Sequence, residues 1–135
     1  MIRVIVDTNV FVSGIFWSGP PNKILKSWQV KKIQLIISPD IFQEYNRVAQ
    51  LLSRKYSSLE LSSIMNLCAT YSEWHQPLPL EEPVSRDPDD DKFIACAISA
   101  GVKVIVSGDR DLLVVSGYQN LEIISPAEFA KRYLN

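Results

Sequence analysis

Hydrophobic positions along the chain fall into short continuous runs that alternate with longer amphipathic stretches. The runs at 2–6, 35–37, 102–106 and 121–124 are rich in β-branched residues, which favours buried strands. The stretches between them place apolar residues three or four positions apart, as in helices with one buried face. Strands that alternate with helices predict right-handed βαβ units and an α/β fold whose mostly parallel sheet is covered on both faces.

Local signals mark where these helices begin and end. A helix is expected after Thr8, and the turn at 17–21 starts a second helix that runs to about Lys32. Ser-Pro pairs at 38–39 and 125–126 begin two others, because serine caps a helix and proline fits its first turn. The remaining predicted elements are a helix at 59–71, a short strand at 72–76, a surface loop at 77–88 and an apolar helix at 90–100 that ends at Gly101.

Length and charge narrow the class of protein. The chain has 135 residues and a formal net charge of −1, which fits a single domain over residues 1–135. No apolar run approaches the ~20 residues that span a bilayer, and the N-terminus lacks a signal-peptide pattern. We therefore expect a cytoplasmic protein without membrane contact. The near-zero charge disfavours a general nucleic-acid coat protein, but not an enzyme that reaches phosphates through bound metal.

Cysteine and histidine do not form a metal-binding pattern. Cys68 and Cys96 lie in predicted helices without a C-x-x-C spacing, which indicates core residues in a reducing compartment. His75 is the only histidine, and we expect it at the surface or at a strand end. A metal site in this chain would then use oxygen ligands.

Four carboxylates from distant parts of the chain are expected to meet at one edge of the sheet. Asp7 ends the first strand and Asp109 comes three residues after the run at 102–106, so both follow the C-terminal ends of parallel strands. Asp91 lies in the first turn of its helix, and Glu44 borders the buried stripe of another. Such a cluster needs a cation, because like charges ~4 Å apart repel by ~4 kcal/mol at an effective dielectric near 20.

Oxygen ligands without histidine or cysteine suit Mg²⁺ or Mn²⁺ rather than zinc. An open site of this kind suits phosphoryl chemistry, because the metal generates a hydroxide nucleophile and polarises the phosphate. Simpler interpretations remain open for single residues. The acids at 89–91 could favour the helix macrodipole, Asp7 could cap the following helix, and Asp109 could sit in a turn with Gly108.

Four motifs follow one another along nearly the whole chain. They are Val-Asp7-Thr8-Asn9-Val, Glu44 in a helix opened by Ser-Pro, Asp87-Pro-Asp-Asp-Asp91-Lys-Phe-Ile-Ala, and Ser107-Gly-Asp109-Arg-Asp111-Leu-Leu. In this order they resemble the PIN domain family. More narrowly, they resemble the VapC-like toxin ribonucleases of bacterial and archaeal toxin–antitoxin pairs.

The resemblance implies a three-layer α/β/α sandwich around a five-stranded sheet. It implies an endoribonuclease that uses Mg²⁺ or Mn²⁺ and a metal-activated water, together with a cognate antitoxin and a homodimer. By correspondence, the catalytic and metal-binding acids are Asp7, Glu44, Asp91 and Asp109, with Asp111 as a further metal ligand through water. The supporting residues are Thr8, Asn9 and Ser107, and either Thr8 or Ser107 would orient Asp7.

The acid run at 87–91 makes the third acid ambiguous. Asp91 is preferred because its spacing to Phe93-Ile94-Ala95 matches the family motif. Arg110 and Arg47 are the candidates for contact with the RNA backbone, since each lies close in sequence to a pocket acid. The alternative paths for RNA run over Lys31 and Lys32, or over Arg54 and Lys55.

Three other functions compete with a ribonuclease. A Mg²⁺-dependent phosphatase with Asp7 as nucleophile would have Asp-x-Asp, whereas the third residue here is Asn9. A receiver-like signalling domain needs paired acids after its first strand, which this chain lacks. A PIN domain that only binds RNA or protein would be marked by the loss of acids, and all four are present.

Overall fold

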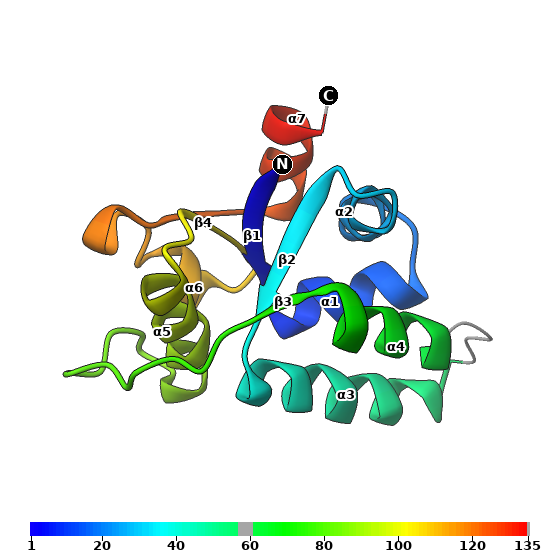
Figure 1. Ribbon diagram of the computed structural model, residues 1–135, viewed down its shortest axis with the longest axis horizontal. Coiled ribbons are helices and arrows are strands. Elements are labelled where there is room, and N and C mark those ends of the chain that lie inside the picture. Colours follow the sequence, from blue (N-terminus) through cyan, green and yellow to red (C-terminus); the bar gives the residue numbers. More distant parts are fainter. Residues whose placement is uncertain (57–60, 135) are drawn as a thin grey trace.

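The computed structural model describes residues 1–56 and 61–134, and its centre is a five-stranded sheet in which every strand runs parallel (Figure 1). The strands are β1 (Ile2–Val6), β2 (Ile33–Ile37), β3 (Glu73–Trp74), β4 (Val104–Val106) and β5 (Glu122–Ile124). Their order across the sheet is β3-β2-β1-β4-β5. The chain moves outwards from β1 to β3 and then crosses back to β4. The order therefore reverses between β1 and β4, where parallel α/β sheets bind their ligands.

The inner strands are buried on both faces, as their continuous runs of branched residues require. Val4–Val6 of β1 pair in register with Val104–Val106 of β4, and all of these side chains are buried. On its other side β1 pairs with β2, where Val4 lies opposite Leu35. This apolar centre holds the ends of β1 and β4 side by side, so the residues that follow them leave the sheet at adjacent points.

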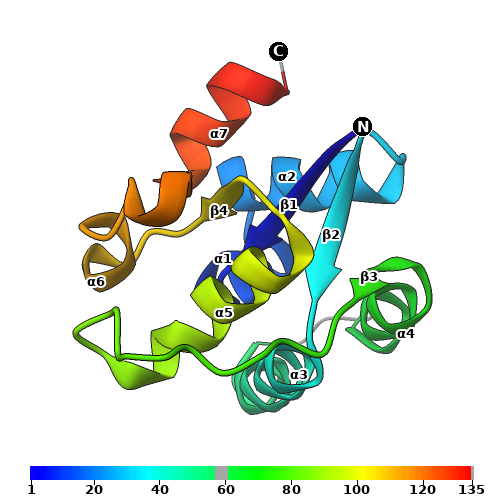
Figure 2. The ribbon, with the colours of Figure 1, turned by 60° about the vertical axis from the view of Figure 1, so that its left-hand side comes forward.

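Helices cover both faces of the sheet and give the expected three layers. They are α1 (Thr8–Phe16), α2 (Pro20–Gln29), α3 (Pro39–Ser53), α4 (Leu61–Tyr71), α5 (Asp91–Ala100), α6 (Arg110–Leu113) and α7 (Pro126–Tyr133), with 3₁₀ turns η1 (Pro88–Asp90) and η2 (Tyr118–Asn120). Figure 2 shows α5 on one face and α1 and α2 on the other. α7 packs against α2.

The predicted helix boundaries at Ser-Pro and Gly are confirmed. The Ser38 hydroxyl accepts a hydrogen bond from the backbone N–H of Ile41 at 3.2 Å, and Ser125 does the same for Glu128 at 3.2 Å. Gly101 ends α5 with φ at 69°, a left-handed conformation that glycine adopts without strain.

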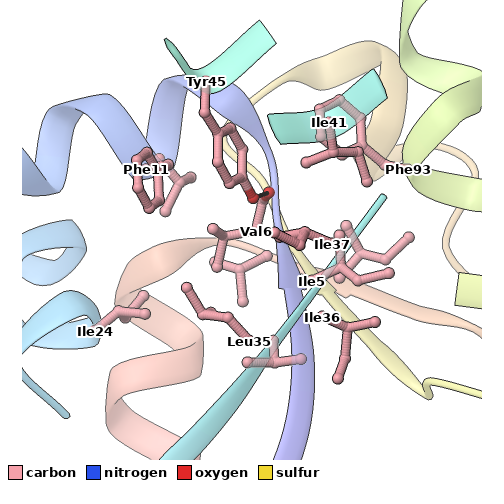
Figure 3. Packing of buried hydrophobic residues seen from close by; sticks show 14 of the residues in the cluster. Ile5, Val6, Phe11, Ile24, Leu35, Ile36, Ile37, Ile41, Tyr45 and Phe93 are labelled. Atoms are coloured by element: carbon pink, nitrogen blue, oxygen red, sulfur yellow. Dashed lines mark hydrogen bonds between the residues drawn. The ribbon is translucent and has the colours of Figure 1, made fainter. Parts of the chain in front are cut away.

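The aromatic pair Phe11 and Tyr45 joins α1 to α3 beside the end of β1 (Figure 3). The rings stack with centroids 4.1 Å apart, and both side chains are fully buried. The Tyr45 hydroxyl donates a hydrogen bond of 2.5 Å to the carbonyl oxygen of Val6. Because Val6 immediately precedes Asp7, this contact fixes α3 against the start of the acidic edge.

Several element boundaries differ from the sequence expectation. The second helix ends at Gln29 rather than near Lys32, because Lys31 has a positive φ of 64°. The strand expected at 102–106 begins at Val104, since the N–H of Val102 still bonds to α5. For the helix expected at 59–71, residues 59 and 60 lie outside the described part, and α4 begins at Leu61.

Three further expectations can be compared with the structure. Cys68 and Cys96 are free thiols in the core. His75 is partly exposed at the end of β3, where its N–H bonds to the carbonyl oxygen of Ile37 at 2.9 Å. Within residues 1–56 and 61–134, no helix combines the length and the apolar character that a membrane crossing requires.

Candidate metal centre

Carboxylates from four segments line one pocket at the C-terminal edge of the sheet. Asp7 follows β1, Asp109 follows β4, Glu44 lies on α3, and Asp90 ends η1. The pocket has a volume of about 170 Å³, and the described residues that line it are Asp7, Thr8, Asn9, Glu44, Val48, Asp87, Asp89, Asp90, Phe93 and Asp109. None of these residues carries a positive charge, so the pocket favours the binding of a cation.

Asp7 is the most firmly held of these acids. One carboxylate oxygen caps α1 by accepting from the N–H of Val10 at 2.9 Å, and the other accepts from the Ser107 hydroxyl. The pKa of Asp7 is nevertheless raised to about 6, because burial and the charges of Asp109 and Glu44 outweigh the lowering effect of these two hydrogen bonds. Of the two hydroxyls expected near Asp7, it is therefore Ser107 that bonds to its carboxylate.

The same serine links Asp7 to the next acid. The backbone N–H of Asp109 donates to the Ser107 hydroxyl oxygen at 2.9 Å. Asp109 in turn caps α6 by accepting from the N–H of Asp111 at 2.9 Å. These hydrogen bonds, which link the Asp7 carboxylate to Ser107 and Ser107 to Asp109, keep the segment after β4 next to the segment after β1.

Glu44 reaches the pocket from α3 and is paired with a lysine. Its Oε2 lies 2.9 Å from the Nζ of Lys92 on α5, and both side chains are about one fifth exposed. Lys92 was not among the residues expected to contribute to the site. Its signal in the sequence is weak, because a lysine next to an acid run usually belongs to a solvated helix start.

The third acid differs from the expectation. Asp90 faces the pocket, whereas the carboxylate of Asp91 accepts from the N–H of Val84 at 3.2 Å and of Ser85 at 2.7 Å. The cause is η1, which turns with about 3.0 residues per turn instead of 3.6 and so changes which aspartate faces inwards. Asp90 rather than Asp91 therefore lines the acidic pocket, and Asp91 instead anchors the loop before η1.

Asp90 lies in a strongly acidic environment. Burial, the neighbouring Asp109 carboxyl and the charges of Asp87 and Asp7 together raise its pKa to about 7. Asp87, Asp90 and Asp111 also bring carboxylate oxygens within 4.8 Å of one another. Asp111 therefore lies close to the pocket acids, although it is not among the described residues that line the pocket.

Two buried side-chain oxygens at this edge, Thr8 Oγ1 and Asp90 Oδ2, have no hydrogen-bond partner. Buried polar atoms in folded proteins nearly always have one, so an unpartnered carboxylate oxygen among acids suggests a cationic ligand. The donor set consists of carboxylate and hydroxyl oxygens, which are the ligands that Mg²⁺ and Mn²⁺ prefer. The residues present thus fit a hard divalent ion.

The two arginines expected to meet RNA differ in whether they line a pocket near the acids. Arg47 lines a second pocket of about 320 Å³ together with Glu44 and Lys92. Arg110 begins α6 and is exposed, but it lines neither of these pockets. Asn9 lines the acidic pocket with its side chain exposed.

The chain is similar to a known protein family and to solved structures. Residues 3–111 match a family model described as PIN domain. The crystal structure of PAE2754 from Pyrobaculum aerophilum superposes with a TM-score of 0.62 at 17% identity, over 98% of this chain and 90% of that one. FitAcB from Neisseria gonorrhoeae gives 0.52 at 14% identity, over 92% and 98%. These two likenesses show a shared fold, and the curated proteins give no match.

Proposed function

The chain belongs to the PIN domain family, and from this membership we propose that it is a metal-dependent endoribonuclease. The observation that carries the proposal is the convergence of Asp7, Glu44, Asp90 and Asp109 on one pocket, with one Asp90 oxygen left unpartnered. Four acids at a sheet edge destabilise the metal-free protein, and binding sites commonly trade stability for function in this way.

In this proposal Asp7, Glu44, Asp90 and Asp109 hold Mg²⁺ or Mn²⁺, with Asp111 behind them. The bound ion would supply an activated water and offset the negative charge of the phosphodiester. The chain itself supplies rigidity: Ser107 and the N–H of Val10 fix both oxygens of Asp7. A ligand held in this way keeps its geometry while the substrate changes.

The sequence motif disfavours the phosphatase alternative. Such an enzyme would have Asp-x-Asp, whereas the third residue here is Asn9. The hydrogen bonds from Ser107 and from the N–H of Val10 hold the Asp7 carboxylate in one orientation at the pocket.

The narrower role rests on the order of the sequence motifs. Their resemblance to VapC-like toxins supports a cytoplasmic toxin that is neutralised by a small antitoxin protein and that forms a homodimer. Expression of the wild-type chain in bacteria should arrest growth, while Asp90→Asn should not. Co-expression of a short gene immediately upstream should restore growth and yield a stable complex.

The enzymatic proposal is tested by cleavage of single-stranded RNA. The wild-type protein should cleave with Mg²⁺ or Mn²⁺ and stop in EDTA, and Asp7→Asn and Asp90→Asn should lose at least about 100-fold in rate. Glu82→Gln removes an exposed carboxylate from the loop before η1 and serves as the matched control. Full activity in excess EDTA would contradict a metal mechanism, and inactivity of the wild type with intact metal binding would favour a PIN domain that only binds RNA or protein.

A further inference from the structure

Lys92 and Glu44 form an ion pair in the wall between two pockets. Glu44 lines both the acidic pocket and the adjoining pocket of about 320 Å³, whereas Lys92 lines only the latter. Their side chains meet at 2.9 Å between α3 and α5. In this structure the ammonium group of Lys92 thus neutralises one acid of the candidate metal centre.

The position of Lys92 is not explained by the stability of its helix. Lys92 is the second residue of α5, where the positive end of the macrodipole disfavours a cation. The side chains of the ion pair are only about one fifth exposed, and the attraction between such charges is largely offset by the cost of removing them from water. The pair is better explained by the charge of the acidic pocket than by helix formation.

The adjoining pocket joins Lys92 to a second cation. Its described lining is Asp40, Gln43, Glu44, Arg47, Asp89 and Lys92. Arg47 and Gln43 lie on the same helix as Glu44 and offer further hydrogen-bond donors. A phosphate that entered here would lie next to the acidic pocket, and the Lys92 ammonium would be within reach of both.

We propose that Lys92 is a positioning residue that exchanges one partner for another. In the metal-free protein it holds Glu44. Once a divalent ion occupies the acids, it binds an RNA phosphate beside the scissile phosphate. The proposal rests on the proposed ribonuclease function. Metal and ammonium compete for the same carboxylate, because both are cations. When the metal takes over the charge of Glu44, Lys92 becomes available to the substrate.

This exchange predicts opposite effects on two ligands. Loss of the Lys92 charge should tighten metal binding, since a competing cation is removed. The same loss should weaken RNA binding, since a phosphate contact is removed. A lysine that only braced α3 against α5 would instead weaken both, because the acids and the phosphate pocket would lose their geometry together.

The test compares Lys92→Met with Lys92→Arg and with the matched control Lys103→Met. Lys103 is an exposed lysine that precedes β4, at the end of the sheet opposite the pocket. Mn²⁺ affinity is measured by electron paramagnetic resonance, and RNA affinity by fluorescence anisotropy in Ca²⁺ at several salt concentrations, with intact RNA verified on gels. Thermal melts in EDTA verify that each variant folds.

Lys92→Met should bind Mn²⁺ at least about threefold tighter and RNA about fivefold weaker, with a salt slope smaller by about one counterion. In cleavage assays it should raise KM more than it lowers kcat. Lys92→Arg should restore RNA affinity, and Lys103→Met should match the wild type in both assays.

Weaker binding of both ligands by Lys92→Met, or unchanged RNA affinity, would overturn the exchange. A wild-type protein that binds Mn²⁺ but neither binds nor cleaves RNA would overturn the ribonuclease proposal itself. In that case tighter Mn²⁺ binding by Lys92→Met would still establish competition for Glu44. Failure of the inference and failure of the proposed function are therefore distinguishable.

Discussion

At the scale of single residues, two adjacent aspartates have different roles. Asp90 lines the acidic pocket with an oxygen that has no partner, while Asp91 accepts hydrogen bonds from the N–H groups of Val84 and Ser85. Removing the charge at one position should therefore affect chemistry, and at the other stability. This contrast distinguishes a metal-binding role for Asp90 from the metal-binding role for Asp91 that the sequence favoured.

Asp91→Asn should lower the free energy of unfolding by about 1–3 kcal/mol. The amide nitrogen of asparagine would face the N–H of either Val84 or Ser85 and leave that donor without an acceptor. It should retain much of the cleavage activity. Asp90→Asn should abolish cleavage and leave the metal-free protein at least as stable as the wild type. Urea denaturation in EDTA and cleavage assays measure both. A stable, inactive Asp91→Asn protein would return the metal role to Asp91.

Asp7→Asn tests the cost of an ionised acid in the core. Burial raises the pKa of Asp7 from 3.8 to about 6, which corresponds to roughly 3 kcal/mol against folding at neutral pH. Asparagine still caps α1. The variant should therefore unfold at higher urea concentration than the wild type at pH 7.5 in EDTA, and this advantage should vanish near pH 4. If the urea midpoint of Asp7→Asn at pH 7.5 were equal to or lower than that of the wild type, the contacts of the ionised Asp7 carboxylate would offset the cost of its burial.

The sequence contains enough to place some of these residues but not others. Asp7 and Asp109 are predictable, because both follow confident buried strands and parallel strands end at one edge. Asp90 is not, since choosing among adjacent acids requires the direction of each side chain. That direction depends on η1, a three-residue turn whose length leaves no hydrophobic period to detect. Lys92 is hidden for a similar reason, because its partner lies on another helix.

At the scale of elements, the site depends on how α3 is seated on the end of β1. The Tyr45 hydroxyl bonds to the carbonyl oxygen of Val6 at 2.5 Å, one residue before Asp7, and Glu44 is the neighbour of Tyr45 in the chain. A single buried hydrogen bond thus sets the spacing between two pocket acids. The buried stripe of α3 can be predicted from the sequence, but the partner of the Tyr45 hydroxyl cannot.

Tyr45→Phe should lower the free energy of unfolding by about 1–3 kcal/mol, because it leaves the buried carbonyl of Val6 without a donor. The stacked contact with Phe11 is preserved, so the m-value should not change. Tyr71→Phe removes a hydroxyl from a side chain that is 59% exposed and is the control. Equal urea midpoints for the two variants would show that the hydroxyl contributes nothing to the seating of α3.

How well a helix or turn can be predicted from the sequence depends on its length. Long elements with caps, such as α3 and α5, show both a hydrophobic period and a Ser-Pro or Gly boundary, and their positions agree with the expectation. The short helix α6 and the turn η2 have four and three residues, too few for any period. In the folded chain α6 packs against β5, a contact that the sequence pattern does not reveal.

At the scale of the whole molecule, the acidic pocket couples folding to pH and to metal. Burial raises the pKa of Asp7 to about 6 and that of Asp90 to about 7, against 3.8 for an ordinary aspartate. Between pH 4 and 7 the native state therefore keeps protons that the unfolded chain releases. Glu73 acts in a different range, because the Arg3 guanidinium lowers its pKa to about 2. The stability that this pairing contributes is lost as the pH falls from about 4.5 towards 2.

The metal-free protein should therefore become less stable as the pH rises from 4 to 7, since stability falls with pH wherever the native state binds more protons. A divalent ion should reverse this trend, because it binds the ionised carboxylates and gains affinity as they lose protons. At a concentration about 100 times its dissociation constant it adds roughly 2.7 kcal/mol. Urea denaturation at pH 5, 6, 7 and 8, in EDTA and in Mn²⁺, measures both slopes. Stability in EDTA that rises across this range would show that these acids do not oppose folding. Equal stabilisation by Mn²⁺ at pH 5 and pH 8 would show that they do not bind the metal. The double variant Asp7→Asn, Asp90→Asn should flatten both curves, which assigns the coupling to this pocket rather than to acids elsewhere on the surface.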